Sequence, residues 1–126
     1  MVLVDTSIWI DYFHGEDTGA ILDDLIDNQL VCINDLILAE LLPSINRRKE
    51  WELKNALLAV PRLALTIHWD EIIAMQTRNL QNGINRVGIP DLLIVQNSLQ
   101  NNIPLLTHDK HFRLMKDLFN LDLYSK

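Results

Sequence analysis

Four acidic residues stand at places in this sequence where a carboxylate could hold a metal ion. They are Asp5, Glu40, Asp91 and Asp109. Like charges that crowd together repel one another and raise each other's pKa, so a cluster of four acids needs cations to be stable. Ligands that are all oxygen favour the hard ions Mg²⁺ or Mn²⁺ over zinc.

Asp5 and Asp109 each lie just past a short apolar run that is typical of a buried strand, 2–4 and 105–107. In an open parallel sheet, functional residues gather outside the carboxyl ends of the strands. We therefore expect both carboxylates at the same edge of the sheet. The alternative is that each acid only caps the helix that follows it, which Asp often does.

Glu40 and Asp91 stand in helices that their apolar neighbours predict to be buried. Glu40 lies in the stretch 36–42, which is apolar nearly all the way round. An ionised carboxylate there costs several kcal/mol unless a metal or a partner charge compensates it; a salt bridge to Arg or Lys, or an exposed edge, is the alternative. Asp91 opens a helix whose next residues, 92–95, are apolar, so it is expected at the mouth of a cleft, although helix dipoles favour acids there in any case.

A pair of metal ions held by carboxylates suits the hydrolysis of phosphodiesters. One ion lowers the pKa of a water for in-line attack on phosphorus, and the other stabilises the leaving oxygen. The net charge is −6, from 11 Lys and Arg against 17 Asp and Glu, which argues against passive nucleic-acid binding. The four acids supply −4 of this charge, which two divalent ions would cancel. The sequence therefore predicts a nuclease.

The expected strands and helices alternate along the chain. Strands are expected at 2–4, 30–33, 63–67 and 105–107, with an edge strand at 121–124. Helices are expected at 8–13, 16–28, 36–42, 47–60, 70–82, 91–99 and 111–118, two of them ended by Pro43 and Pro61. This order favours an α/β fold, a three-layer α/β/α sandwich around a central, mostly parallel sheet of four to five strands. A chain of 126 residues fits a single domain, 1–126.

The four acids lie in segments that together resemble a known family. The segments are Val4-Asp5-Thr6-Ser7, Leu38-Ala39-Glu40-Leu41, Ile89-Pro90-Asp91-Leu92-Leu93-Ile94 and Leu105-Leu106-Thr107-His108-Asp109-Lys110-His111-Phe112. In this order and approximate spacing they resemble the PIN-domain ribonucleases, in particular the VapC-type toxins of bacterial and archaeal toxin–antitoxin pairs. The resemblance covers essentially the whole chain.

The resemblance implies an activity, a metal site and partners. It implies that Asp5, Glu40, Asp91 and Asp109 hold Mg²⁺ or Mn²⁺, and that Thr6, Ser7 and Thr107 orient the carboxylates or a water on the metal. It also implies RNA as substrate, a homodimer, and a small antitoxin whose tail fills the active-site groove. The main hypothesis is a metal-dependent endoribonuclease that acts as the toxin.

Other functions for a small α/β domain remain open as alternatives. An interaction module with the same fold would not cleave RNA, and metal binding and turnover would decide between the two. A phospho-accepting receiver domain needs paired acids after the first strand, where Asp5 stands alone. A haloacid-dehalogenase-type phosphatase needs a second Asp two residues after Asp5, where Ser7 is found.

Basic residues near the acids are candidates for contact with RNA phosphates. Arg86 and Lys110 precede and follow acidic positions in sequence, and Arg47 begins the only basic run, 47–49. For that run, a solvated helix face paired with Glu50 and Glu52 is favoured over a contact with RNA. His108 and His111 are spaced i, i+3, but they come with no third histidine or cysteine ligand, so zinc is not favoured.

The number of cysteines and the hydropathy of the sequence indicate the cellular compartment of the protein. Cys32 is the single cysteine, so no internal disulfide can form. No apolar run approaches the roughly 18 residues that span a bilayer, and the start lacks the pattern of a signal peptide. We therefore expect a cytoplasmic protein that does not enter a membrane.

Three aromatic residues crowd one short helix: Trp9, Tyr12 and Phe13. Core packing explains at least one of them, and a partner could cover the others.

Overall fold

A three-stranded parallel sheet lies at the centre of the fold. The computed structural model describes residues 1–15 and 19–125. Its strands are β1 (Val2–Val4), β2 (Val31–Cys32) and β3 (Leu105–Leu106), in the order β2-β1-β3. In the register of β1, Leu3 pairs with Cys32 on one side and with Leu105 on the other. The first and nearly the last elements of the chain are therefore neighbours at the sheet.

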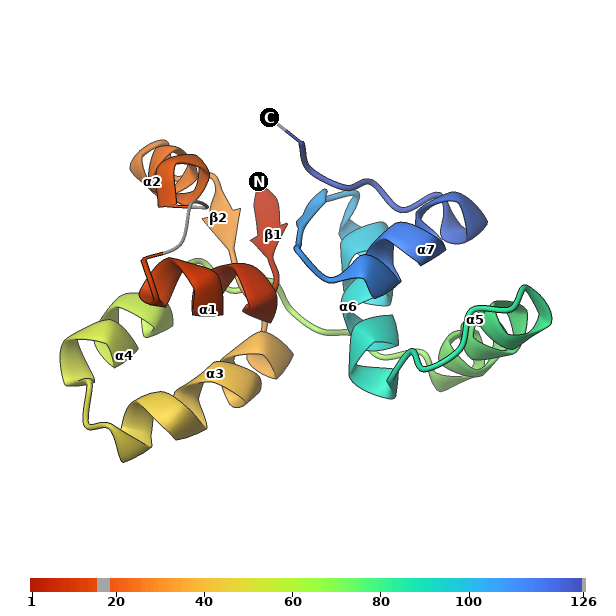
Figure 1. The fold of residues 1–126 in the computed structure, drawn as a ribbon, viewed down its shortest axis with the longest axis horizontal. Helices are drawn as coiled ribbons and strands as arrows, with labels where there is room; N and C mark the ends of the chain where they lie inside the picture. Colours follow the sequence, from red (N-terminus) through yellow and green to blue (C-terminus); the bar gives the residue numbers. More distant parts are fainter. Residues whose placement is uncertain (16–18, 126) are drawn as a thin grey trace.

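Helices connect the strands and enclose them. They are α1 (Thr6–Phe13), α2 (Gly19–Asp27), α3 (Asp35–Arg47), α4 (Trp51–Leu58), α5 (Trp69–Gln81), α6 (Ile89–Asn101) and α7 (Lys110–Phe119). Figure 1 shows the strands between two groups of helices, α1 to α4 at the left and α5 to α7 at the right. Within the groups, α3 packs on α1 and α4, and α5 packs on α6 and α7. The predicted α/β class with a parallel sheet is confirmed.

The sheet is narrower than predicted, with three strands instead of four to five. The segments expected as the remaining strands, 63–67 and 121–124, each join the sheet by one isolated bridge only. The bridges pair Ile33 with Arg62, the residue just before the first of these segments, and Leu105 with Leu123, both in parallel.

The backbone of residues 64–68 is bound by side chains of α6 where a neighbouring strand was expected. Asn97 Nδ2 donates to the carbonyl of Ala64 at 2.9 Å, and Gln100 Nε2 donates to the carbonyl of Thr66 at 2.9 Å. Gln96 both accepts from and donates to the backbone of His68. These amides satisfy the polar groups of an extended segment without a strand ladder. The periodicity of apolar residues in the sequence does not show that side-chain amides, and not a neighbouring strand, bind this backbone.

Helix α3 continues through Pro43, which was expected to end it, to Arg47. Proline removes the hydrogen bond to the carbonyl four residues earlier, that of Ala39. Both residues are exposed, so water can reach that carbonyl and the helix tolerates the loss. The helix expected at 47–60 is shortened to α4, and a turn with Lys49 at φ 58° separates it from α3. The expected start of the helix 16–28 lies outside the described residues.

The core is apolar and lies on both sides of the sheet. Its largest fully buried side chains include Leu3 of β1, Leu92 and Ile94 of α6, and Phe112 of α7. Burying one such side chain contributes about 1.5–3 kcal/mol to folding. No helix in the described part of the chain has the length and apolar character needed to cross a membrane.

A buried pair of asparagines links the two groups of helices. Asn34 caps α3 by accepting from the backbone of Ile37 at 2.9 Å, and it donates to Asn97 Oδ1 at 3.0 Å. Asn97 uses its own Nδ2 on the carbonyl of Ala64. Both asparagines are essentially inaccessible to solvent. This network fixes the start of α3 relative to α6, the helices that carry Glu40 and Asp91.

We predict that Asn97→Ala lowers the free energy of unfolding by about 2–4 kcal/mol, because it leaves the buried amide of Asn34 without its partner and also removes the bond to the carbonyl of Ala64. Equilibrium denaturation in urea measures the loss. Gln100→Ala is the matched control, since it removes a similar bond from an exposed side chain and should cost less than about 1 kcal/mol. Equal losses in the two variants would contradict a special role for the buried pair.

Candidate active site

The acids at the strand ends emerge on one edge of the sheet, as predicted. Asp5 directly follows β1, and Asp109 follows β3 at the start of α7. The alternative of helix capping applies to one of them: the side chain of Asp109 accepts from the backbone of His111 at 2.9 Å, whereas the side chain of Asp5 makes no capping bond. Asp5 is therefore held by other groups.

Two hydroxyl groups hold the same oxygen of Asp5. Ser7 Oγ donates to Asp5 Oδ2 at 3.0 Å, and Thr107 Oγ1 donates to it at 2.8 Å. Each hydroxyl also accepts a backbone N–H, that of His108 onto Ser7 and that of Asp109 onto Thr107. Asp5 is 5% exposed, and its Oδ1 accepts no hydrogen bond from the described residues. The arrangement orients one buried carboxylate and leaves its second oxygen open.

Glu40 differs from its prediction, because it lies on the exposed side of α3. The helix buries Ile37, Leu38 and Leu41, whereas Glu40 is accessible, so its surroundings are not apolar all round. Thr6 Oγ1 donates to Glu40 Oε1 at 3.0 Å. Among the described residues Glu40 forms no salt bridge with Arg or Lys, the other partner considered for it. Partial removal from water raises the pKa of Glu40, the bond from Thr6 lowers it, and the charge of Asp5 raises it further.

Asp91 lies in the first turn of α6, half-buried and facing the other acids. Removal from water raises its pKa first, and the negative charges of Asp109 and Asp5 raise it further. A backbone hydrogen bond from Gly88 and the imidazole of His111 act in the opposite direction. The net shift of the pKa is upward, mainly because the carboxylate is removed from water and also because like charges lie nearby.

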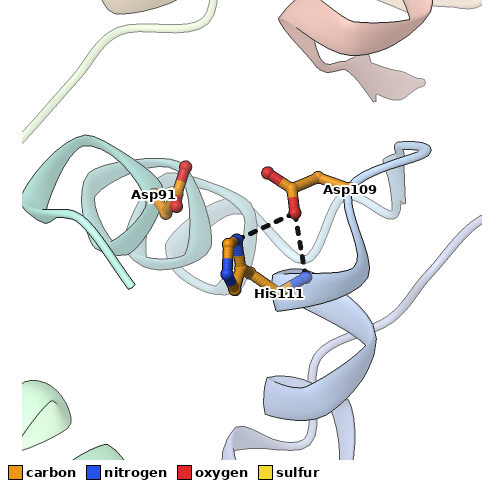
Figure 2. Close-up of side chains that lie close together, drawn as sticks. All are labelled: Asp91, Asp109 and His111. Carbon is orange, nitrogen blue, oxygen red and sulfur yellow. Dashed lines mark hydrogen bonds and ion pairs between the residues drawn. The ribbon is translucent and has the colours of Figure 1, made fainter. Parts of the chain in front are cut away.

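Asp91, Asp109 and His111 form a compact group of metal-ligating side chains. Each offers one ligand atom, and these atoms lie within 4.8 Å of one another. Figure 2 shows the imidazole below and between the two carboxylates, with Asp91 on α6 and Asp109 at the start of α7. His111 Nδ1 lies 3.0 Å from Asp109 Oδ1. The group therefore combines oxygen and nitrogen donors.

His111 is not one of the site residues predicted from the sequence. Its spacing in the sequence pairs it with His108, but the structure separates the two: His108 Nε2 lies 3.5 Å from Asp11 Oδ2, on α1. His111 instead turns back to Asp109, two residues earlier. The signal was present in the sequence, because a histidine in the first turn after an N-cap aspartate is within reach of that carboxylate.

The basic candidates for RNA contact are all exposed. Lys110 is the first residue of α7, next to Asp109, and Arg86 lies with φ 67° in the loop that leads into α6. Arg47 is at the far end of α3. Lys110 and Arg86 are therefore next to elements that carry acids, whereas Arg47 is about two turns of helix away from Glu40.

A pocket of about 240 Å³ lies between α1, α3 and α4. Its lining includes Ile10 and Phe13 of α1, Glu40 and Leu41 of α3, and Arg48. Of the crowded aromatics on α1, Trp9 is buried and donates to the carbonyl of Val4 at 3.2 Å, so core packing explains it. One wall of this pocket is thus shared with the acidic site through Glu40.

Comparisons with known proteins agree with this geometry. The PIN-domain family model matches residues 2–118. A chain of FitAcB from Neisseria gonorrhoeae is similar in fold, with a TM-score of 0.77, 17% identity, and coverage of 99% of this chain and 97% of that one. A chain of a toxin–antitoxin complex from Klebsiella pneumoniae has a TM-score of 0.63, 18% identity, and coverage of 87% and 88%.

A third similar structure is VapC20 of Mycobacterium tuberculosis, a toxin that cleaves the sarcin–ricin loop. Its TM-score is 0.62 at 16% identity, over 90% of this chain and 94% of that one. No curated protein matches the sequence significantly. At these identities the solved structures show a common fold, and the family model spans nearly the whole chain. The chain belongs to the PIN-domain family.

Proposed function

We propose that this protein is a metal-dependent endoribonuclease that hydrolyses RNA phosphodiester bonds and acts as the toxin of a toxin–antitoxin pair in the cytoplasm. The observation that carries the proposal is the group formed by Asp91, Asp109 and His111 at the sheet edge where Asp5 also emerges. Membership of the PIN-domain family, whose members include nucleases, supports the same conclusion.

The donor set suits a divalent cation. Removal from water raises the pKa of Asp91 and of Glu40, and neighbouring charges raise them further, those of Asp109 and Asp5 for Asp91 and that of Asp5 for Glu40. None of these acids forms a salt bridge with Lys or Arg in the described parts of the chain. A cluster of carboxylates without such partners is stabilised by Mg²⁺ or Mn²⁺. We propose Asp5, Glu40, Asp91 and Asp109 as the acids that hold the metal.

A bound divalent ion supplies two effects, a lowered pKa for an attacking water and a charge that stabilises the leaving oxygen. The chain itself supplies orientation. Ser7 and Thr107 fix Asp5 through one oxygen, and Thr6 fixes one oxygen of Glu40, so each carboxylate keeps its second oxygen available. The exposed cations Lys110 and Arg86 are proposed to contact the RNA phosphates, with Arg47 as a more distant candidate.

A small antitoxin protein is the proposed partner. A related chain of the same fold was crystallised as a toxin–antitoxin complex, and the pocket between α1, α3 and α4 gives a segment of such a protein a place beside the acids. The lining of the pocket includes the apolar side chains of Ile10 and Phe13, two acids, Glu40 and Glu50, and the cation Arg48. A segment with apolar residues and one cation would complement it.

We also propose that the protein is a homodimer. An exposed apolar stripe runs along one face of α5, where Trp69, Ile73 and Leu80 are 56%, 64% and 60% exposed. Their spacing of four and seven residues places them on a single helix face. Large apolar side chains gathered on one exposed face mark an interaction surface, and a second copy of the chain would cover it.

We predict that the purified protein cleaves a pool of small RNAs in Mg²⁺ or Mn²⁺ and is inactive in EDTA. Asp5→Asn and Asp91→Asn should each lower the rate on the order of 100-fold or more, because the position of the ion is lost. Asp117→Asn, an exposed position on α7, is the control and should cleave normally. A folded wild type that neither cleaves RNA nor binds metal by calorimetry would refute the proposal and favour the interaction module.

We predict opposite effects of Asp91→Asn on stability and on metal binding. Burial raises the folded-state pKa of Asp91, so its contribution to stability is present below its unfolded pKa and is lost as the pH rises through the folded value. At neutral pH the ionised group destabilises the metal-free fold. Asp91→Asn should therefore raise the Tm in EDTA by a few degrees, since about 1 kcal/mol corresponds to roughly 2–8 °C.

The same variant should lose the rise in Tm that Mn²⁺ produces in the wild type, because a ligand that binds only the folded state stabilises it. The advantage of the variant in EDTA should shrink as the pH falls and Asp91 becomes protonated in the wild type. Thermal scans with and without Mn²⁺ at several pH values measure both effects. A variant less stable than the wild type in EDTA at neutral pH would contradict this account of charge crowding.

We predict that Ile73→Glu converts the protein from a dimer to a monomer, since it places a charge in the centre of the apolar stripe on α5. Light scattering after gel filtration should give twice the 14.6 kDa of one chain for the wild type and 14.6 kDa for the variant. Leu58→Glu, at an exposed apolar position on α4, should remain dimeric. A monomeric wild type at tens of micromolar would rule out this interface.

A further inference from the structure

The side chain of His111 is fixed by Asp109. Asp109 Oδ1 accepts from the backbone N–H of His111 at 2.9 Å and lies 3.0 Å from His111 Nδ1. Figure 2 shows both contacts converging on this one oxygen, while the second oxygen of Asp109 is turned to the side of Asp91. The imidazole is therefore positioned by two contacts at one carboxylate oxygen.

This contact places a ligand atom of the ring beside the acids. In a neutral imidazole one nitrogen carries the proton and the other carries a lone pair. Nδ1 lies 3.0 Å from Asp109 Oδ1, and one ligand atom each of His111, Asp91 and Asp109 lie within 4.8 Å of one another. With the proton on Nε2, the lone pair of Nδ1 faces this group. Neighbouring ligands of an octahedral ion lie about 3 Å apart, so Nδ1 and Asp109 Oδ1 are spaced as two ligands of one ion.

We propose that His111 supplies an imidazole nitrogen to the metal ion held by Asp91 and Asp109, an inference that rests on the proposed function. We propose that this ligand makes the site select Mn²⁺ over Mg²⁺. Four carboxylates alone would not distinguish the two ions strongly, because both accept oxygen ligands. Mg²⁺ prefers oxygen ligands and exchanges them for nitrogen only reluctantly, whereas transition metal ions such as Mn²⁺ accept imidazole more readily. The selectivity of this site is thus set by one residue outside the four acids.

Electron spin-echo spectroscopy of bound Mn²⁺ tests the ligand directly, without reference to activity. The wild type should show modulation from a ¹⁴N nucleus bound to Mn²⁺, and His111→Asn should not. His108→Ala is the matched control, because His108 is the neighbouring histidine and contacts Asp11 instead of the acids. The control should keep the nitrogen signal.

Calorimetry tests the selectivity. In His111→Asn the amide nitrogen takes the place of Nδ1, so the bond to Asp109 can be kept while the ring nitrogen is lost. The Mn²⁺ affinity should fall by about 10-fold or more, and the Mg²⁺ affinity by less than about threefold. His111→Ala, which also removes the bond to Asp109, should weaken the binding of both ions.

The outcomes separate this inference from the proposed function. A wild type that binds Mn²⁺ without a nitrogen signal, or a His111→Asn variant with an unchanged ratio of Mn²⁺ to Mg²⁺ affinity, would overturn the role of His111 and leave the nuclease proposal intact. A folded wild type that binds neither ion would refute the metal site itself. Circular dichroism of each variant confirms that the comparison is made between folded proteins.

Discussion

The parallel pairing of β1 with β3 is the constraint on which the site depends. It brings Asp5, near the start of the chain, beside Thr107, more than 100 residues later, and the hydrogen bond between them is 2.8 Å long. Ser7 completes the arrangement from the first turn of α1. Because both hydroxyls also accept backbone N–H groups from the loop after β3, the same contacts that orient Asp5 fix the start of α7 and hence Asp109.

The charges at this edge oppose the stability that the sheet provides. The pKa values of Asp91 and Glu40 are raised by desolvation and by neighbouring acids, so each ionised carboxylate adds free energy to the metal-free fold. An apolar core and a polar network of asparagines offset this cost elsewhere in the domain. Natural proteins accept such local destabilisation where a ligand later compensates it.

Much of this arrangement could be predicted from the sequence, and the predictions that were wrong or missing have physical reasons. Asp5 and Asp109 could be placed because a short apolar run followed by an acid predicts a strand end, and strand ends meet at one edge. Glu40 was wrongly expected to be buried, since an apolar stretch does not show which narrow face of a helix reaches solvent. The strand expected at 63–67 failed because side-chain amides bind that backbone. His111 was not predicted, although its place two residues after the N-cap Asp109 puts it within reach of that carboxylate.

Helix α6 connects these observations. Its first turn carries Asp91, and its later turns carry Gln96, Asn97 and Gln100, which bind the extended segment 64–68. Asn97 also reaches Asn34, which caps α3, the helix of Glu40. One helix therefore fixes an acid from each group of helices relative to the sheet. Substitutions deep in α6 that touch none of the acids should then shift the site as well as the stability, because both depend on the same buried amides.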